Sequence, residues 1–199
     1  MWGTVTGSRI RTVNAHSNEI SILSASKSKL ASGSKDKTVR VWDTATWECT
    51  STFECDDEVE SVALYPNSDR VATCTYWRLY VWDTATRQLI ASESVSYANS
   101  VAVSNDGKWL AVASYKTISL YDTNTLDCIW SHDRQSDFVS FSRDSCQLVS
   151  ANLFDDKAEL FDAQIGSFVK SFKHDRVSSA VFSHDGTRVL SGESCSAAL

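Results

Sequence analysis

Short apolar runs that alternate with polar residues recur along nearly the whole chain. In its first part they cover residues 9–13, 20–23, 30–33 and 38–42, with polar turn residues between them. A period of two residues is typical of β-strands with one buried face, and turn residues every 8–12 positions are typical of short antiparallel strands. No segment shows a convincing helical period. The pattern predicts an all-β fold.

The same order of segments continues to the end of the chain, and four strands end in an aromatic residue followed by Asp. These aromatic residues are Trp42, Trp82, Tyr121 and Phe161, at intervals of 40, 39 and 40 residues. The later predicted strands are residues 59–64, 71–74, 79–82, 100–103, 109–113, 118–121, 138–141, 147–150, 158–161, 177–182, 189–192 and 197–199. The chain is therefore an internal repeat with a period near 40 residues.

A period of about 40 residues with Trp-Asp at the end of a short strand resembles the WD40 family of β-propellers. The resemblance covers the whole chain and implies one β-propeller domain of four-stranded antiparallel blades, with about five repeats, either partial or five-bladed. The expected repeats are residues 8–47, 48–87, 88–126, 127–166 and a partial 167–199, with residues 1–7 as the end of a preceding repeat.

In this family four polar groups hold a blade together: a His before the first strand, a Ser or Thr on the second, an Asp in the next turn, and the Trp. A buried chain of this kind specifies the fold when every group has a partner, and is costly when one is missing. The first repeat carries all four, as His16, Ser32, Asp36 and Trp42. The resemblance implies that these residues form the structural network of the first blade.

The later repeats keep only part of this set, so we expect them to depend more on apolar packing. Asp56 stands near the His position of the second repeat, His132 and Asp155 are the candidates in the fourth, and Cys195 replaces the Asp of the fifth. The retained positions are Thr73 and Trp82 in the second repeat, Tyr121 in the third, Ser150 and Phe161 in the fourth, and His174 and Ser191 in the fifth.

Composition narrows the class of protein. The net charge is −6, which argues against the basic patch or stripe that nucleic-acid binding requires, so no nucleic-acid partner is expected. Apolar runs of three or four residues are far shorter than the roughly 20 needed to span a bilayer, and no signal peptide is recognisable. The six cysteines form no C-x-x-C pair and are expected to be small buried thiols in a reducing compartment. We expect an intracellular, cytoplasmic protein without membrane attachment.

No catalytic, cofactor-binding or metal-binding residues are expected. The chain has no Gly-rich phosphate loop, and its four histidines lack Cys or carboxylate partners at the spacing of metal ligands. An enzyme with a site in the central channel is the alternative, since propellers of other families have such sites. The innermost strands carry small and apolar residues here, which argues against it.

One segment carries an unusual concentration of charge: five of the seven residues from 54 to 60 are acidic. The propeller assignment places it in a loop between an outer strand and the next inner strand, and places three turn aromatics on the same face. The candidate partner-binding rim consists of Glu54, Asp56, Asp57, Glu58, Tyr76, Trp77 and Tyr115. It is either a docking surface for a basic peptide or a solvated loop partly neutralised by Lys35 and Lys37.

Both ends of the chain fall at the same phase of the repeat, with Trp2 lying 40 residues before Trp42. Either the chain is an excerpt of a longer protein, or an N-terminal strand closes a five-bladed ring against the C-terminal strands. The usual number of about seven blades in the resembled family favours the excerpt.

The expected function is that of a non-catalytic scaffold for protein–protein interaction, or of a ligand-sensing module. The degenerate Thr-Ala-Thr repeats resemble the sensor arrays of fungal NACHT-type NTPase signalling proteins, in which an NTPase domain lies upstream. The implied partners are other proteins or peptides, and that NTPase within a longer parent protein. A non-functional gene fragment is the remaining alternative.

Overall fold

The structure is a computed structural model that describes residues 7–9, 12–173, 176–193 and 197–198. These residues form antiparallel β-sheets in which the strands follow their sequence order. The first sheet contains β1 (Ile20–Ala25), β2 (Lys29–Ser34), β3 (Thr38–Asp43) and β4 (Cys49–Glu54), and the second contains β5 (Val59–Leu64), β6 (Arg70–Thr75), β7 (Arg78–Asp83) and β8 (Leu89–Ser94).

Two further four-stranded sheets and a sheet with three described strands follow. The third contains β9 (Ala98–Val103), β10 (Trp109–Ser114), β11 (Ile118–Asp122) and β12 (Cys128–His132), and the fourth contains β13 (Phe138–Phe141), β14 (Gln147–Asn152), β15 (Lys157–Asp162) and β16 (Phe168–Lys173). The fifth contains β17 (Val177–Phe182), β18 (Val189–Glu193) and β19 (Ala197–Ala198).

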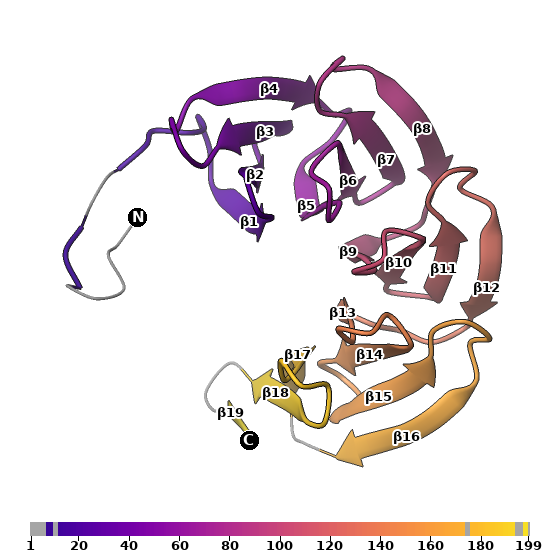
Figure 1. The fold of residues 1–199 in the computed structure, drawn as a ribbon. Helices are drawn as coiled ribbons and strands as arrows, with labels where there is room; N and C mark the ends of the chain where they lie inside the picture. The colour runs from indigo at the N-terminus through magenta and orange to yellow at the C-terminus, as the bar shows by residue number, and fades with distance from the viewer. Residues whose placement is uncertain (1–6, 10–11, 174–175, 194–196, 199) are drawn as a thin grey trace.

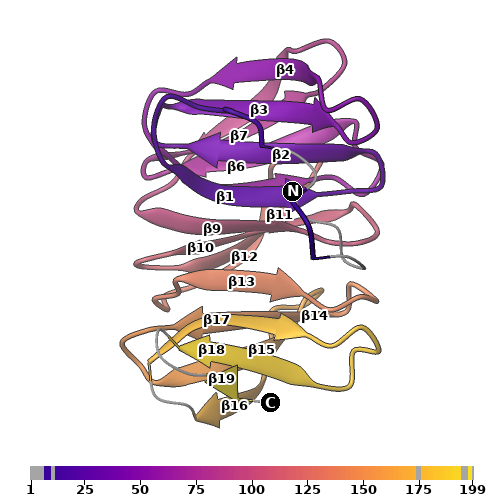
Figure 2. The ribbon, with the colours of Figure 1, turned by 90° about the vertical axis from the view of Figure 1, so that its left-hand side faces the viewer.

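The sheets stand like blades around an arc, with β1, β5, β9, β13 and β17 innermost and β4, β8, β12 and β16 on the circumference (Figure 1). Each inner strand packs against the inner strand of the next sheet. The described part of the arc is open between the first and the fifth sheet, as the side view also shows (Figure 2). This is the predicted all-β propeller of four-stranded antiparallel blades.

One predicted strand is wrong over its last two residues. Of the outer strand expected at residues 9–13, Arg9 makes a single bridge, whereas Thr12 and Val13 are not in a strand, and residues 10 and 11 lie outside the described residues. Trp2, His174 and Cys195 also lie outside them. Across the part of the chain that the structure describes, no helix is long and apolar enough to cross a membrane.

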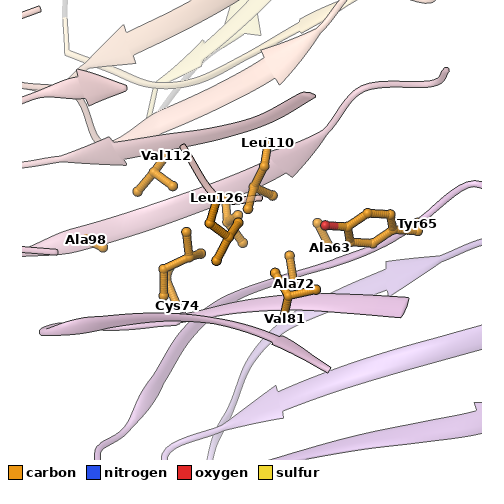
Figure 3. Packing of buried hydrophobic residues seen from close by; sticks show 11 residues of the cluster. Ala63, Tyr65, Ala72, Cys74, Val81, Ala98, Leu110, Val112 and Leu126 are labelled. Atoms are coloured by element: carbon orange, nitrogen blue, oxygen red, sulfur yellow. The ribbon is translucent and has the colours of Figure 1, made fainter. Parts of the chain in front are cut away.

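The core lies between consecutive sheets. Figure 3 shows one such layer, in which Ala72 and Cys74 of β6 pack with Leu110 and Val112 of β10. Small residues allow close approach: a Cβ on Gly33 of β2 would lie 2.5 Å from a methyl group of Val59. The sheets therefore interlock face to face, and each blade depends on its neighbours for burial.

The thiols differ from the expectation. Cys74 is buried and Cys55 is partly buried, but the other three described cysteines, Cys49, Cys128 and Cys146, are exposed. The prediction of buried thiols is wrong for these three. Cys49 and Cys128 lie on the outer strands β4 and β12, and Cys146 lies in the turn before β14. One side of each of these segments faces solvent, and a two-residue period does not reveal which residues lie on that side.

The Asp of the repeated phrase builds the turn after the third strand of each of the first four sheets. The carboxylate of Asp43 accepts hydrogen bonds from the backbone N–H groups of Ala45 (2.8 Å) and Thr46 (2.9 Å). Asp83, Asp122 and Asp162 do the same two and three residues ahead. A side chain that bonds its own backbone in this way stabilises a turn, so the Asp is required for local rather than tertiary reasons.

The first and fifth sheets each have one free face, beside the opening of the arc. These free faces carry apolar residues of the kind that are buried between neighbouring sheets elsewhere in the arc. Ile20 and Leu23 of β1 are 42% and 58% exposed, whereas Val59 and Val62, at the same register positions of β5, are 0% and 4% exposed. A groove of about 360 Å³ runs over this free face, lined mainly by apolar residues that include Leu23 and Trp42. Leu190 of β18 is likewise exposed on the fifth sheet.

Candidate interaction surface

The structure brings the four polar groups of the first repeat together. Trp42 Nε1 donates to Ser32 Oγ (3.0 Å), which lies 2.7 Å from His16 Nε2, and His16 Nδ1 lies 3.0 Å from a carboxylate oxygen of Asp36. The His16 side chain is fully buried. With the proton on Nδ1, one continuous chain runs from the indole to the carboxylate and leaves no ring nitrogen without a partner.

Asp36 ends this chain as an ionised group. Burial alone would raise its pKa, but hydrogen bonds from Thr38, Ser17 and His16 outweigh burial and hold the pKa of Asp36 well below its usual range. The Thr38 hydroxyl donates at 2.6 Å, and the backbone N–H groups of Ser17 and Thr38 both donate at 3.0 Å. The arrangement anchors the segment before β1 to the β2–β3 turn, which is a structural role.

The second blade lacks this chain. Thr73 Oγ1 and Trp82 Nε1 are both buried and have no hydrogen-bond partner among the described residues. Trp82 stacks instead with Phe53 (ring centroids 5.1 Å apart) and Tyr80 (5.4 Å). Apolar and aromatic packing therefore replaces the polar network, as the divergent sequence predicts.

The residue at the His position of the second blade is Cys55, not Asp56. Cys55 lies four residues before the inner strand β5, as His16 lies four residues before β1. Burial raises the pKa of the Cys55 thiol to about 12, so it is a neutral packing group. Asp56 is more exposed and forms an ion pair with Arg78 (3.5 Å).

The third and fourth blades are held differently again. Tyr121 is half-buried on β11, Ser150 is buried on β14, and Phe161 is completely buried on β15. His132 bonds the Gly166 carbonyl (2.6 Å) and stacks on Phe161, so it is not the His of a blade network.

An ion pair that the sequence did not suggest crosses the fourth blade. Arg134 donates to Glu159 Oε1 (2.5 Å) and lies over the rings of Phe161 and Phe168. Asp155 is exposed and pairs with Lys157 (3.6 Å). Arg134 lies in a loop outside any predicted strand, so spacing gave no signal for it.

Four aromatic side chains form a cluster on one face of the arc, which we call the aromatic cluster: Tyr76, Trp77, Tyr97 and Tyr115. The ring centroids of Tyr76, Trp77 and Tyr97 lie 4.8–5.1 Å from one another, and Tyr115 lies 6.3 Å from Tyr97. Tyr76, Trp77 and Tyr115 are 38%, 49% and 55% exposed. The cluster spans the β6–β7 turn, the β8–β9 loop and the β10–β11 turn.

Backbone hydrogen bonds fix these turns relative to one another. The N–H of Val95 donates to the Trp77 carbonyl (3.0 Å), that of Ala98 to the Tyr76 carbonyl (3.2 Å), and that of Tyr115 to the Tyr97 carbonyl (3.0 Å). Tyr97 is not among the predicted rim residues, although its place one residue before β9 puts it on the same face. The cluster is thus part of the rigid framework of the second and third blades.

The acidic loop, residues 54–58, adjoins this cluster. Asp56 pairs with Arg78, which follows Trp77 directly, and Asp57 pairs with Lys37 (3.6 Å). Lys35, expected to help neutralise the loop, forms its ion pair with Glu19 (2.8 Å), and its charge also interacts with those of Glu58 and Glu60. Of the predicted rim, the structure brings Tyr76, Trp77 and Tyr115 together and places Asp56 beside Arg78 and Asp57 beside Lys37. In the described part of the chain, no hydrogen bond or ion pair joins Glu54 or Glu58 to the aromatic cluster.

Among the described residues, no group of three or more His, Cys, Asp or Glu side chains is placed to hold a metal ion.

Two family models match the chain. One, described as the TEP-1 C-terminal beta-propeller, matches residues 16–82, and the other, described as the WD domain, G-beta repeat, matches residues 87–122. They cover adjacent parts of the first three blades.

Curated relatives match over most of the chain. Eukaryotic translation initiation factor 3 subunit I of Aspergillus oryzae is 25% identical over 202 residues, and that of Neosartorya fischeri is 26% identical over 208 residues; each match covers 87% of this chain. Protein LST8 homolog of Drosophila melanogaster is 31% identical over 87 residues, which is 41% of this chain and 28% of that protein. The chain spans 58% and 59% of the length of the two fungal relatives. With the radial sheets and the 40-residue period, these matches support a β-propeller built from WD40-type repeats.

Proposed function

We propose that this chain is a non-catalytic interaction scaffold that binds a protein partner through the aromatic cluster and the adjoining acidic loop. The observation that carries the proposal is the exposure of Tyr76, Trp77 and Tyr115 together on one face. Large aromatic side chains dominate binding energy where they form a contiguous exposed patch, because each buries much area on contact. Single exposed apolar residues would carry no such meaning.

Rigidity supports the same proposal. The three turns are tied to one another by backbone hydrogen bonds, so the rings are already placed before a partner arrives. Binding then loses less conformational entropy than it would with a mobile loop.

The relatives support the class of function. By its name, the fungal initiation factor protein is a subunit of a larger factor, which suits a propeller that contacts other proteins. We extend only this general role to the present chain. The free thiols of its five described cysteines suit a reducing compartment, in keeping with a cytoplasmic location.

A variant pair tests the proposal. Tagged wild-type chain, Tyr76→Ser/Trp77→Ser and Leu89→Ser/Ile90→Ser would be compared by quantitative mass spectrometry of proteins that co-purify from cell extract. Leu89 and Ile90 are 46% and 41% exposed on β8, so the second variant removes a similar apolar pair from the circumference. We expect a protein that is retained by wild type and the β8 variant and lost from the cluster variant. If the same proteins co-purify with all three, the proposed surface is wrong.

A narrower role depends on a longer parent protein. We propose that there the propeller would serve as the sensing end of a NACHT-type signalling protein, with the NTPase domain upstream. The genomic reading frame tests this directly, since such a domain requires a G-x-x-x-x-G-K-[ST] loop. A parent reading frame without that loop would reject the narrower role and leave the scaffold proposal unaffected.

A further inference from the structure

We infer that the partner segment bound at the aromatic cluster is basic. In the free protein, Lys116 and Arg78 of this chain occupy the positions that the cationic groups of the partner take on binding. This inference rests on the proposed function and specifies the chemistry of the partner. It follows from the position of the acidic loop, from the balance of charge, and from the cations already present at the rings.

The acidic loop and the aromatic cluster are one surface. The carboxylate of Asp56 reaches Arg78, and the Asp56 backbone N–H lies 3.5 Å from the Tyr80 hydroxyl of the same strand, β7. Because Trp77 is the chain neighbour of Arg78, a segment that covers the Trp77 ring can extend to Asp56, the partner of Arg78. A ligand can therefore contact rings and carboxylates at the same time.

The charge of this surface is unbalanced. Its acids are Glu54, Asp56, Asp57, Glu58 and Glu60, and the cations beside them are Lys35, Lys37 and Arg78. Five acids against three cations leave a formal charge of −2. Burial is the largest cause of the raised pKa of Glu60; the charges of Glu58 and Asp57 raise this pKa further, and Lys35 offsets only part of the effect. A cationic ligand would supply further counter-charge, and an anionic one would be repelled.

The counter-charges that are present can be displaced. The Asp56–Arg78 and Asp57–Lys37 contacts are 3.5 and 3.6 Å long, and all four side chains are more than one-third exposed. Exposed ion pairs of this kind contribute little free energy, so exchanging one cation for another costs little.

The rings already bind a cation. Lys116 Nζ lies over the Tyr97 ring, 5.4 Å from its centroid. Trp77 is a stronger acceptor of cations by ring type, and among the described residues no Lys or Arg lies over it. The cluster thus has one ring position filled from within the chain and a better one open to a partner.

The test uses two synthetic peptides with a fluorescent label. The first alternates Arg and Gly over ten residues, and the second has citrulline in place of each Arg, which keeps the shape and removes the charge. Fluorescence anisotropy with the full 199-residue chain would give both dissociation constants at 50 and 200 mM salt. We expect the Arg peptide to bind about 10-fold more tightly than the citrulline peptide, with affinity falling as salt rises.

Four variants distinguish specific binding of the Arg peptide at the aromatic cluster from non-specific attraction of the peptide to acidic side chains. Trp77→Ser should weaken Arg-peptide binding about 5-fold and Glu58→Gln about 2-fold, whereas Lys116→Gln should strengthen it about 2-fold because the Tyr97 ring becomes free. Lys108→Gln is the matched control, because Lys108 is an exposed lysine in the β9–β10 turn on the opposite face, and it should change nothing. Circular dichroism would verify that each variant is folded.

Three results would overturn the inference: equal affinity for both peptides, weaker binding by Lys116→Gln, or full retention of binding by Trp77→Ser. The partner-capture comparison stays separate from these. A captured protein that depends on Tyr76 and Trp77, together with equal affinity for the two peptides, would mean that the surface binds a neutral partner. The scaffold proposal would then stand without the basic ligand.

Discussion

Ser32 and Thr73 occupy the same register position in consecutive blades, yet only one of the two hydroxyl groups has hydrogen-bond partners. Ser32 Oγ contacts His16 Nε2 and Trp42 Nε1, whereas Thr73 Oγ1 has none among the described residues. We therefore predict opposite outcomes for removing the two hydroxyls. Ser32→Ala should destabilise the chain, and Thr73→Val should not.

The magnitudes follow from the partners left behind. Ser32→Ala deprives a buried indole N–H and a buried imidazole nitrogen of their partners, and each such loss costs about 1–3 kcal/mol. Because both belong to one network the costs are not additive, so we expect a total of about 2–4 kcal/mol. Thr73→Val replaces a buried unpaired hydroxyl by a methyl group of similar shape, and should change stability by about 0 to 1 kcal/mol in the favourable direction.

Urea unfolding followed by circular dichroism measures both effects as differences in midpoint at a common slope. The matched design matters because both substitutions change a single atom group on the second strand of a blade. A loss below about 1 kcal/mol for Ser32→Ala, or a comparable loss for Thr73→Val, would refute the reasoning that the first blade has a working polar network that the second blade lacks.

Three other outcomes are expected. The pKa of Asp36 is lower in the folded than in the unfolded chain, so its carboxylate stabilises the fold above the unfolded pKa of about 3.8, and this stability is lost as pH falls through the folded pKa. The urea midpoints of wild type and Asp36→Asn should therefore converge between pH 5 and about pH 2. Gly166→Ala should cost more than Gly186→Ala in the same assay, because both have φ near +70° but only at Gly166 would a Cβ meet another side chain, 2.7 Å from the Trp130 ring; equal losses would show that backbone strain alone decides. Leu23→Lys should reduce self-association in sedimentation velocity, since Leu23 is an exposed apolar residue on the free face of β1. An unchanged distribution of sedimentation coefficients would show that this face does not mediate association between copies of the chain.

Most of the strands could be predicted because each has its own local pattern. Alternation of apolar and polar residues located the strands, and the Asp after each third strand marked the turns that it stabilises. The segment around Thr12 failed because alternation does not guarantee a partner strand. A strand needs a neighbour to pair with, and that is a tertiary property.

The candidate surface was only partly predictable for the same reason. Tyr76, Trp77 and Tyr115 were evident because they are aromatic residues in turns, where no core position is available. Tyr97 joins them only through packing between blades. The Arg134–Glu159 pair likewise joins a loop to a strand 25 residues later, a separation at which sequence spacing carries no information.

The described part of the arc is open between the first and the fifth sheet (Figure 1), and this has a consequence for the order in which the sheets unfold. In an array of repeats each unit is stabilised mainly by its nearest neighbours, so units with one neighbour open more readily than units with two. Amide protons of β6 and β10 should therefore exchange more slowly than those of β2 and β18. Because Tyr76 and Trp77 project from the second sheet and Tyr97 and Tyr115 from the third, the aromatic cluster sits on the most protected units. A partner could remain bound there while the ends of the array open and close.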